Sequence, residues 1–263
     1  MARGREESIL RQDWNKVPKD WYSIYQWGGT SSVRYREWVA EWIVESFEDI
    51  QLETEGLREK GFKVIGHRGQ AKLSTGIGQF TEKRFVRAIF NLGQLLPLGE
   101  IIDYEVPLKA TNAAEHGDID LLCLASDAIM CVEAKDPRGS TSILKAIVQS
   151  FVYTSLAVIR HKTFEEEFKL PTTLPFTPAI LIGSQDGLQL QQLSMYSHLS
   201  KLVGKLNQKL AKSGAGAIRF FIIENDKSEF ASCLTTVAKP NGVKKIIFAD
   251  GFTPNVVEWL NPA

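Results

Sequence analysis

The sequence predicts an α/β protein in which a mixed β-sheet is flanked by helices. Short apolar runs at residues 101–108, 119–122 and 128–132, bounded by Gly, Ser and Asp, have the composition of buried strands. Segments with the apolar spacing of helices precede and follow these three runs. The order of helix, three strands and helix predicts a layered fold with the sheet at its centre.

The chain divides into an N-terminal helical extension, residues 1–60, and a main α/β domain, residues 61–263, which we expect to form one structural unit. The extension is rich in aromatic residues, and a helix is predicted from its Gly-Gly-Thr-Ser-Ser turn to about residue 56. Trp38 and Trp42 have helical spacing in it. Such aromatic side chains could stack on nucleic-acid bases, but packing on the main domain is the simpler expectation.

The C-terminal part of the chain continues the α/β pattern. Strands are predicted at residues 179–182, 217–223 and 244–248, a helix over residues 188–212, and a short helix or strand at residues 256–260. The Glu-rich residues 164–168 predict a surface turn. No pattern typical of catalysis occurs in this part.

Charged side chains interrupt the second and third apolar runs. Ser126 and Asp127 separate these runs, too few residues for a crossover helix, so a hairpin is predicted. Asp120 and Glu133 are then about equally far from the turn, and alternation puts Glu133 and Lys135 on one face. An unpaired buried charge is costly, so this cluster requires a partner, for which a divalent cation is suited. The alternative is a salt-bridged cluster at a strand end, with Asp120 as a partner of Lys135.

These residues resemble the motif of the PD-(D/E)xK nuclease superfamily, and more narrowly its RecB-like branch. The resemblance covers roughly residues 79–155 and implies a restriction-endonuclease-like fold. The matching positions are Asp120, the triplet Glu133, Ala134 and Lys135, the pair Gln149 and Tyr153, and the upstream Glu82.

The resemblance also implies a set of metal ligands. Asp120, Glu133 and the backbone carbonyl at Ala134 would bind the metal, and Glu82 would bind it directly or through water. Oxygen ligands of this kind favour Mg²⁺ or Mn²⁺. Asp118 competes with Asp120 for the metal role, and the spacing from the preceding glycine favours Asp120.

Three further residues receive catalytic roles from the same resemblance. Lys135 would orient the attacking water or stabilise the charge that grows on the phosphate oxygens. Gln149 and Tyr153, which share a helix face, would support Lys135 or contact the substrate backbone. They could also be ordinary helix-packing residues.

The formal net charge is zero, so nucleic-acid binding would have to rest on a local basic patch. Positive charge concentrates before and on the predicted Glu82 helix and after the Glu133 strand. An ordinary solvated surface would explain it equally well. The candidates for phosphate contact are Arg68, Lys72, Lys83, Arg84, Arg87, Arg138 and Lys145.

Other patterns narrow the class of protein. Cys123, Cys131 and Cys233 lack the spacing of a metal site and are expected to be reduced core residues. The four histidines lack zinc-site spacing. Neither a signal peptide nor a membrane span is predicted, so we expect a cytoplasmic protein.

The sequence therefore predicts a metal-dependent nuclease that hydrolyses phosphodiester bonds in nucleic acid, with DNA as the expected substrate. The alternative is a nuclease-like module that binds DNA or a protein partner without cutting, which the neutral net charge and the aromatic N-terminus favour. A protein partner or a homodimer stays open under both interpretations.

Overall fold

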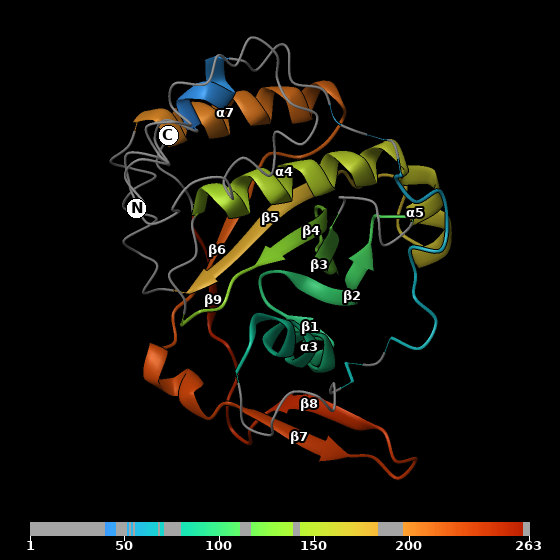
Figure 1. The fold of residues 1–263 in the computed structure, drawn as a ribbon, viewed down its shortest axis with the longest axis vertical. Helices are drawn as coiled ribbons and strands as arrows, with labels where there is room; N and C mark the ends of the chain where they lie inside the picture. The colour runs from blue at the N-terminus through green and yellow to red at the C-terminus, as the bar shows by residue number, and fades with distance from the viewer. Residues whose placement is uncertain are drawn as a thin grey trace, which may run out of the picture.

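The computed structural model describes residues 40–45, 52, 54, 56–67, 69–70, 80–110, 117–138, 143–183 and 197–259. Its centre is a seven-stranded mixed sheet in the order β1-β2-β3-β4-β5-β6-β9 (Figure 1). This confirms the predicted α/β class with a mixed sheet flanked by helices. The strands are β1 (Gln94–Leu95), β2 (Gly99–Pro107), β3 (Asp118–Leu124), β4 (Ile129–Ala134), β5 (Phe176–Gly183), β6 (Arg219–Ile223) and β9 (Val256–Trp259).

The three strands predicted from the first apolar runs are the neighbours β2, β3 and β4. β3 and β4 form the predicted antiparallel hairpin, with Leu124 opposite Ile129. β5 and β6 continue the sheet parallel to β4, and β9 returns antiparallel to β6. Because a parallel neighbour needs a crossover, the chain between β4 and β5 passes through α4 (Ile143–Ile159) and α5 (His161–Phe168).

Helices cover both faces of the sheet (Figure 1). α4 packs across β4 and β5, and α7 (Ser197–Lys212) packs on α4. α3 (Glu82–Leu92) covers the opposite face near β2. After the short 3₁₀ helix η4 (Lys227–Ala231), a hairpin of β7 (Leu234–Ala238) and β8 (Lys244–Phe248) packs on α3. α3 therefore lies between the main sheet and this second, two-stranded sheet.

Each face of the main sheet has its own hydrophobic core. Successive side chains of a strand alternate between the faces, so Ile180 and Ile182 join the α4 core while Ala179 and Leu181 join the α3 core. All residues of β5 are buried, as expected for a strand between two parallel neighbours.

Some elements, among them α5 and β7, differ from the sequence-based expectations. The Glu-rich residues 164–168 are not a surface turn but belong to α5, because Phe164 and Phe168 are both buried at helical spacing in the α4 core. Strand β7 was not predicted, because its residues are only partly buried and form no continuous apolar run. The sequence left residues 256–260 as either a short helix or a strand, and the structure has the strand β9 there.

The described part of the N-terminal extension agrees with a packing role. Residues 40–45 are helical, and Ala40, Trp42 and Ile43 are buried in the α4 core. Trp38 and the aromatic residues before it lie outside the described residues. So do residues 188–196, the start of the helix predicted to end at residue 212.

Within the described ranges, no single helix has both the length and the apolar character needed to cross a membrane. α4 and α5 reach that length only as a pair bent by 83°, and most of α4 is buried inside the protein.

Candidate active site

The β3–β4 hairpin brings two acidic side chains together. Leu121 pairs with Val132, so the next residues outward, Asp120 and Glu133, lie level on adjacent strands. The Asp120 carboxylate accepts a hydrogen bond from the backbone N–H of Ala134, at 2.9 Å. The predicted approach of Asp120 to the Glu133 triplet is thus present in the structure.

Lys135 follows directly after β4 and completes the cluster. Its backbone N–H donates to the carbonyl of Leu181 at 2.9 Å, which extends the pairing with β5 by one residue. Its ammonium group contacts the carboxylate of Glu133 and lies 3.8 Å from that of Glu82. The Lys135 and Glu133 side chains are each only 4% exposed. The ion pair is therefore almost fully removed from water.

Glu82 reaches this cluster from a different layer of the fold. It is the first residue of α3, whose N-cap is Thr81, and the Thr81 side chain accepts a hydrogen bond from the backbone N–H of Arg84 at 3.2 Å. The cap sets where the helix begins, and thereby where Glu82 projects. With 37% of its side chain exposed, Glu82 is the carboxylate of the cluster most open to solvent.

Burial controls the electrostatics of the cluster. It raises the pKa of Asp120 well above its usual range, and the neighbouring charge of Glu133 raises it further. Burial also raises the pKa of Glu133, against the opposing effect of the Lys135 ammonium. For Lys135, burial alone would lower the pKa, but the charges of Glu133, Asp120 and Glu82 outweigh it and raise the pKa. The site thus holds a stable buried cation among carboxylates that are costly to ionise.

Gln149 and Tyr153 face the start of β3 from α4. The Gln149 side-chain amide donates to the Tyr153 hydroxyl at 3.2 Å, as their spacing on one helix face predicts. The Tyr153 ring packs against Gly117, next to the two aspartates of β3. The side-chain oxygen of Gln149 is buried and accepts no hydrogen bond from the described residues. The pair therefore lies beside the strand end that carries Asp120.

Asp118 and Asp120 have different surroundings. The main charges acting on Asp118 are those of Lys109, Lys83 and Glu105, and burial raises its pKa. Those acting on Asp120 come from Glu133, Lys135 and Glu82. The structure groups Asp120, and not Asp118, with the Glu133 triplet.

Two of the predicted phosphate-binding arginines are buried. Arg84 and Arg87 are 4% and 5% exposed, so the expectation that they form a basic surface on their helix is wrong. Arg87 donates to both carboxylate oxygens of Glu105, at 2.8 and 3.0 Å, and to the carbonyl of Gln70. Arg84 donates to the Thr236 hydroxyl on β7 at 3.3 Å. Both serve the packing of α3, because it lies between two sheets and has little free surface.

Three of the other basic candidates lie among the described residues, and two do not. Lys83 is exposed on α3. Arg138 stacks on Phe80, with its guanidinium carbon 3.8 Å from the ring centroid, and pairs with Asp136 at 3.1 Å. Lys145 is half-buried on α4, and its charge acts on Glu133. Arg68 and Lys72 lie outside the described residues.

Glu105 is an acidic neighbour that sequence reasoning missed. Val106 pairs with Ile119 and Tyr104 with Leu121, so Glu105 lies level with Asp120 on the other side of β3. Its φ of 45° is in the left-handed region, which is rare for a residue other than glycine. Nothing in the local sequence indicates this conformation.

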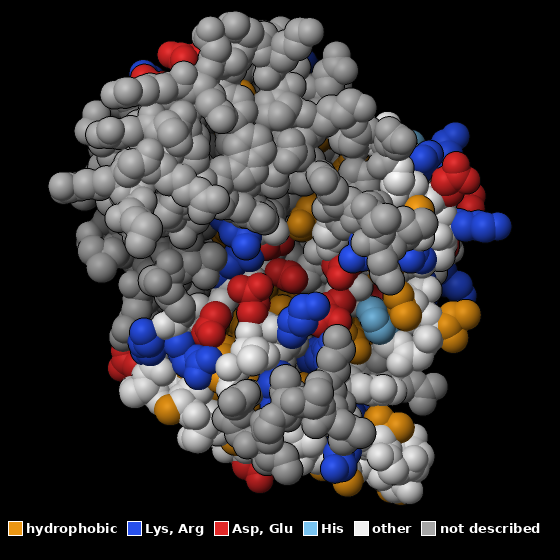
Figure 2. Space-filling view, viewed as in Figure 1, with side chains coloured by type: hydrophobic (Ala, Val, Ile, Leu, Met, Phe, Trp, Pro, Cys, Tyr) orange, Lys and Arg blue, Asp and Glu red, His pale blue; other side chains and the backbone are white. Residues whose placement is uncertain are grey.

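One face of the protein carries charges of both signs. Acidic side chains gather across the middle of this face, with lysine and arginine side chains around them and a histidine beside them (Figure 2). Among the described residues, no three Asp, Glu, His or Cys side chains converge closely enough to enclose a metal ion alone. Comparisons with protein-family models, characterised proteins and solved structures found no match to this chain.

Proposed function

We propose that this chain is a metal-dependent nuclease of the PD-(D/E)xK type, in its RecB-like branch, that hydrolyses phosphodiester bonds in DNA. The order of elements supports a restriction-endonuclease-like fold: α3, then the neighbouring strands β2, β3 and β4, then α4 and a parallel β5. The residues that resemble the family's motif lie on these elements in the order that the resemblance implies. Glu82 begins α3, Asp120 lies on β3, Glu133 lies on β4, and Gln149 and Tyr153 lie on α4.

One observation carries the proposal. The Lys135 ammonium is buried in contact with Glu133 and near Glu82, beside the half-buried Asp120. An interior built only for stability would be served as well or better by apolar side chains of similar volume. Charged groups with shifted pKa values that gather at a strand end are typical of functional sites.

The residues present fit a hard divalent cation such as Mg²⁺ or Mn²⁺. Mg²⁺ is usually held by one or two carboxylates and keeps several waters, so a ring of three acidic side chains is not required. Asp120, Glu133 and the carbonyl of Ala134 would hold the ion, with Glu82 reaching it directly or through water. A positive ion would also offset the energetic cost of ionising Asp120 and Glu133, whose pKa values are raised by burial.

Such an ion would polarise the scissile phosphate and activate water for attack. The protein side chains would supply the other contacts to the substrate. Lys135 would donate to phosphate oxygens as their negative charge grows, and it stays protonated because its pKa is raised. Gln149 and Tyr153 would hold the substrate backbone or position Lys135 from α4. Lys83 would contact phosphate at the exposed side of the site.

A non-cutting module that binds DNA or a protein is the second candidate. It is favoured by the partners that the carboxylates already have, since Glu133 pairs with Lys135 and Asp120 accepts the Ala134 N–H. In such a site both carboxylates would have hydrogen-bond or ion-pair partners without a bound metal ion.

Incubation of the full chain with single-stranded, duplex and branched DNA, with and without Mg²⁺ or Mn²⁺, separates the two candidates. We expect cleavage that needs a divalent ion and disappears in Lys135→Met. Lys201→Met is the matched control, because Lys201 is an exposed lysine on α7. DNA that stays intact with both ions, while the chain still binds it, would favour the binding module.

A further inference from the structure

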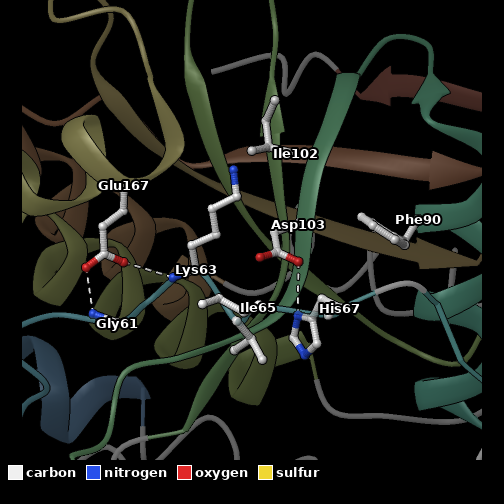
Figure 3. A pocket seen from close by; sticks show the side chains of 10 residues that line it. Gly61, Lys63, Ile65, His67, Phe90, Ile102, Asp103 and Glu167 are labelled. Carbon is white, nitrogen blue, oxygen red and sulfur yellow. Dashed lines mark hydrogen bonds and ion pairs between the residues drawn. The ribbon is translucent and has the colours of Figure 1, made fainter.

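A pocket of about 530 Å³ lies against strand β2 (Figure 3). The loop of residues 61–67 forms one wall, and residues of α3, β2 and α5 form the others. Its walls combine polar side chains, namely Lys63, His67, Asp103 and Glu167, with apolar ones such as Ile65 and Phe90. A mixed lining of this kind is typical of sites for small organic ligands.

The acidic side chains of the pocket are already engaged by the protein. Glu167 accepts hydrogen bonds from the backbone N–H groups of Gly61 and Lys63, at 2.6 and 2.9 Å. Asp103 accepts from the backbone N–H of Tyr104 at 2.9 Å and faces Nδ1 of His67 at 3.0 Å. These carboxylates hold the loop and the histidine in place. The polar side-chain groups left to meet a ligand are the Lys63 ammonium, which lies 5.9 Å from the centroid of the Phe168 ring, and the second ring nitrogen of His67.

His67 is held in one orientation. The Asp103 carboxylate, whose side chain is only 5% exposed, lies 3.0 Å from Nδ1 of His67, and a proton on Nδ1 makes this contact a hydrogen bond. The second ring nitrogen is then left for a ligand, and it donates to a phosphate oxygen when the ring carries both protons. The imidazole ring also stacks on Tyr104, with 4.2 Å between the ring centroids. The second ring nitrogen points away from Asp103 (Figure 3). A buried anchor and a fixed ring are the features expected of a histidine that binds a ligand at its free nitrogen.

The apolar side of the pocket suits a flat ring. Phe90 is half-buried and offers an aromatic surface, and the Ile65 side chain is fully exposed at the rim. A ligand that places a phosphate near Lys63 and His67 and an aromatic base near Phe90 would use both sides. Nucleotides combine these two chemical features, and bases stack well on aromatic side chains.

The pocket is also close to the proposed cleavage centre. Asp103 precedes Glu105 by two residues on β2, and Glu105 lies level with Asp120. Strand geometry makes this offset about 7 Å along β2 and about 4.8 Å across to β3. A polynucleotide strand covers such a distance in a few nucleotides, since its stacked residues are about 3.4 Å apart.

We propose that this pocket binds one nucleotide of the substrate strand with its base unpaired. The proposal rests on the nuclease function and narrows its substrate to nucleic acid with single-stranded character. A base that is paired and stacked in a duplex cannot enter a pocket unless it is extruded. Lys63 and His67 are the contacting residues, and Asp103 is a positioning residue that acts through His67.

Calorimetric titration of the full chain with thymidine 5′-monophosphate tests the pocket. EDTA is present, so that cleavage plays no part. We expect binding that is about tenfold tighter than that of inorganic phosphate or thymidine, because each of these lacks half of the contacts. Lys63→Met and His67→Gln should weaken binding about tenfold. Asp103→Asn should weaken it as well, although Asp103 does not touch the ligand, and Lys201→Met should not.

Lys63 is exposed, so its substitution leaves the core intact and keeps the test valid if His67→Gln lowers stability. The proposal is overturned if the nucleotide binds no tighter than phosphate, or if Lys63→Met binds it like the wild type. The requirement for an unpaired base is tested by measuring the fluorescence anisotropy of labelled DNA as protein is added, once with a short single strand and once with a blunt duplex. Lys63→Met should weaken only the single-stranded complex, and an equal loss on both would overturn that part.

These outcomes separate the two proposals. Nucleotide binding that depends on Lys63 without any DNA cleavage would leave the pocket as a nucleotide site and remove the nuclease function. Cleavage that depends on Lys135 without nucleotide binding would keep the nuclease function and remove the pocket.

Discussion

The hydroxyl group of Tyr153 lies so close to Gly117 that a Cβ atom on residue 117 would come within 2.2 Å of it. This contact joins α4 to the residue that precedes β3. Real Cβ atoms do not approach other heavy atoms so closely, so a larger residue at position 117 would require the Tyr153 side chain to shift. The same hydroxyl accepts a hydrogen bond from Gln149 at 3.2 Å. The glycine before the aspartates thus has a packing role, which is to let this helix approach the site.

Gly117→Ala should therefore destabilise the protein by about 1–3 kcal/mol, the usual effect of overpacking. Urea denaturation would measure the loss. In a double-mutant cycle with Tyr153→Ala, which removes the opposing ring, the two changes should couple by about 1 kcal/mol. Strict additivity would show that the contact is not tight.

Lys135→Met should reduce the rate of DNA cleavage on the order of 10²–10³, because it removes a charge that stabilises the growing phosphate charge. It should also lower the free energy of unfolding by roughly 3–5 kcal/mol in metal-free buffer, because Glu133 would stay buried without its partner. Single-turnover kinetics and chemical denaturation measure the two effects. The double variant Glu133→Gln and Lys135→Met should recover part of the stability but none of the activity. A cleavage rate equal to wild type in Lys135→Met would remove this residue from the site.

Divalent ions should stabilise the wild-type protein against heat. An ion that binds only the folded state contributes about 2.7 kcal/mol at a hundred times its dissociation constant. Asp120→Asn should reduce this increase in melting temperature. Asp118→Asn should retain most of it, because the main charges that act on Asp118 are not those of the Glu133 and Lys135 cluster. Glu166→Gln, an exposed position on α5, is the control. Melting scans with and without Mg²⁺ or Mn²⁺ give the answer, and a response lost only in Asp118→Asn would reverse the choice of ligand.

Substitution of Arg87 should lower the free energy of unfolding. Arg87→Met leaves the partly buried Glu105 without its bidentate partner and should cost roughly 3–5 kcal/mol of stability. Lys83→Met, one turn away and exposed, should leave stability nearly unchanged and weaken DNA binding. Thermal melting and DNA titration at two salt concentrations separate the effects. A stable Arg87→Met protein with weakened DNA affinity would restore Arg87 as a phosphate contact.

Burial raises the pKa of Cys131 to about 12 and that of Cys233 to about 11. A thiol in the unfolded chain ionises at about 8.5. The folded state holds these protons more tightly, so the contribution of the thiols to stability is full below about pH 8.5 and is lost as pH rises toward 11 and 12. Native protein at pH 8 should react with iodoacetamide far more slowly than urea-unfolded protein. Comparable labelling in both states would contradict the buried, protonated thiols.

Much of the fold could be predicted because local patterns agreed with the final packing. The hairpin of β3 and β4 follows from two apolar runs and a connection too short for a helix. β7 could not be predicted in this way, since its stability comes from packing on α3 and not from an apolar run of its own. The helix α5 was missed because its glutamates obscured two phenylalanines at helical spacing.

By itself, the sequence determined which chemical groups could meet: Asp120, Glu133 and Lys135 on two adjacent strands, because register in a short hairpin leaves little choice. Only the tertiary structure decided which other charges joined them. It placed Glu82 beside Lys135 from another layer, turned Arg84 and Arg87 inward between two sheets, and paired His67 with Asp103 at a pocket. These contacts join residues far apart in the chain, and their geometry depends on how whole layers pack, which no local pattern encodes.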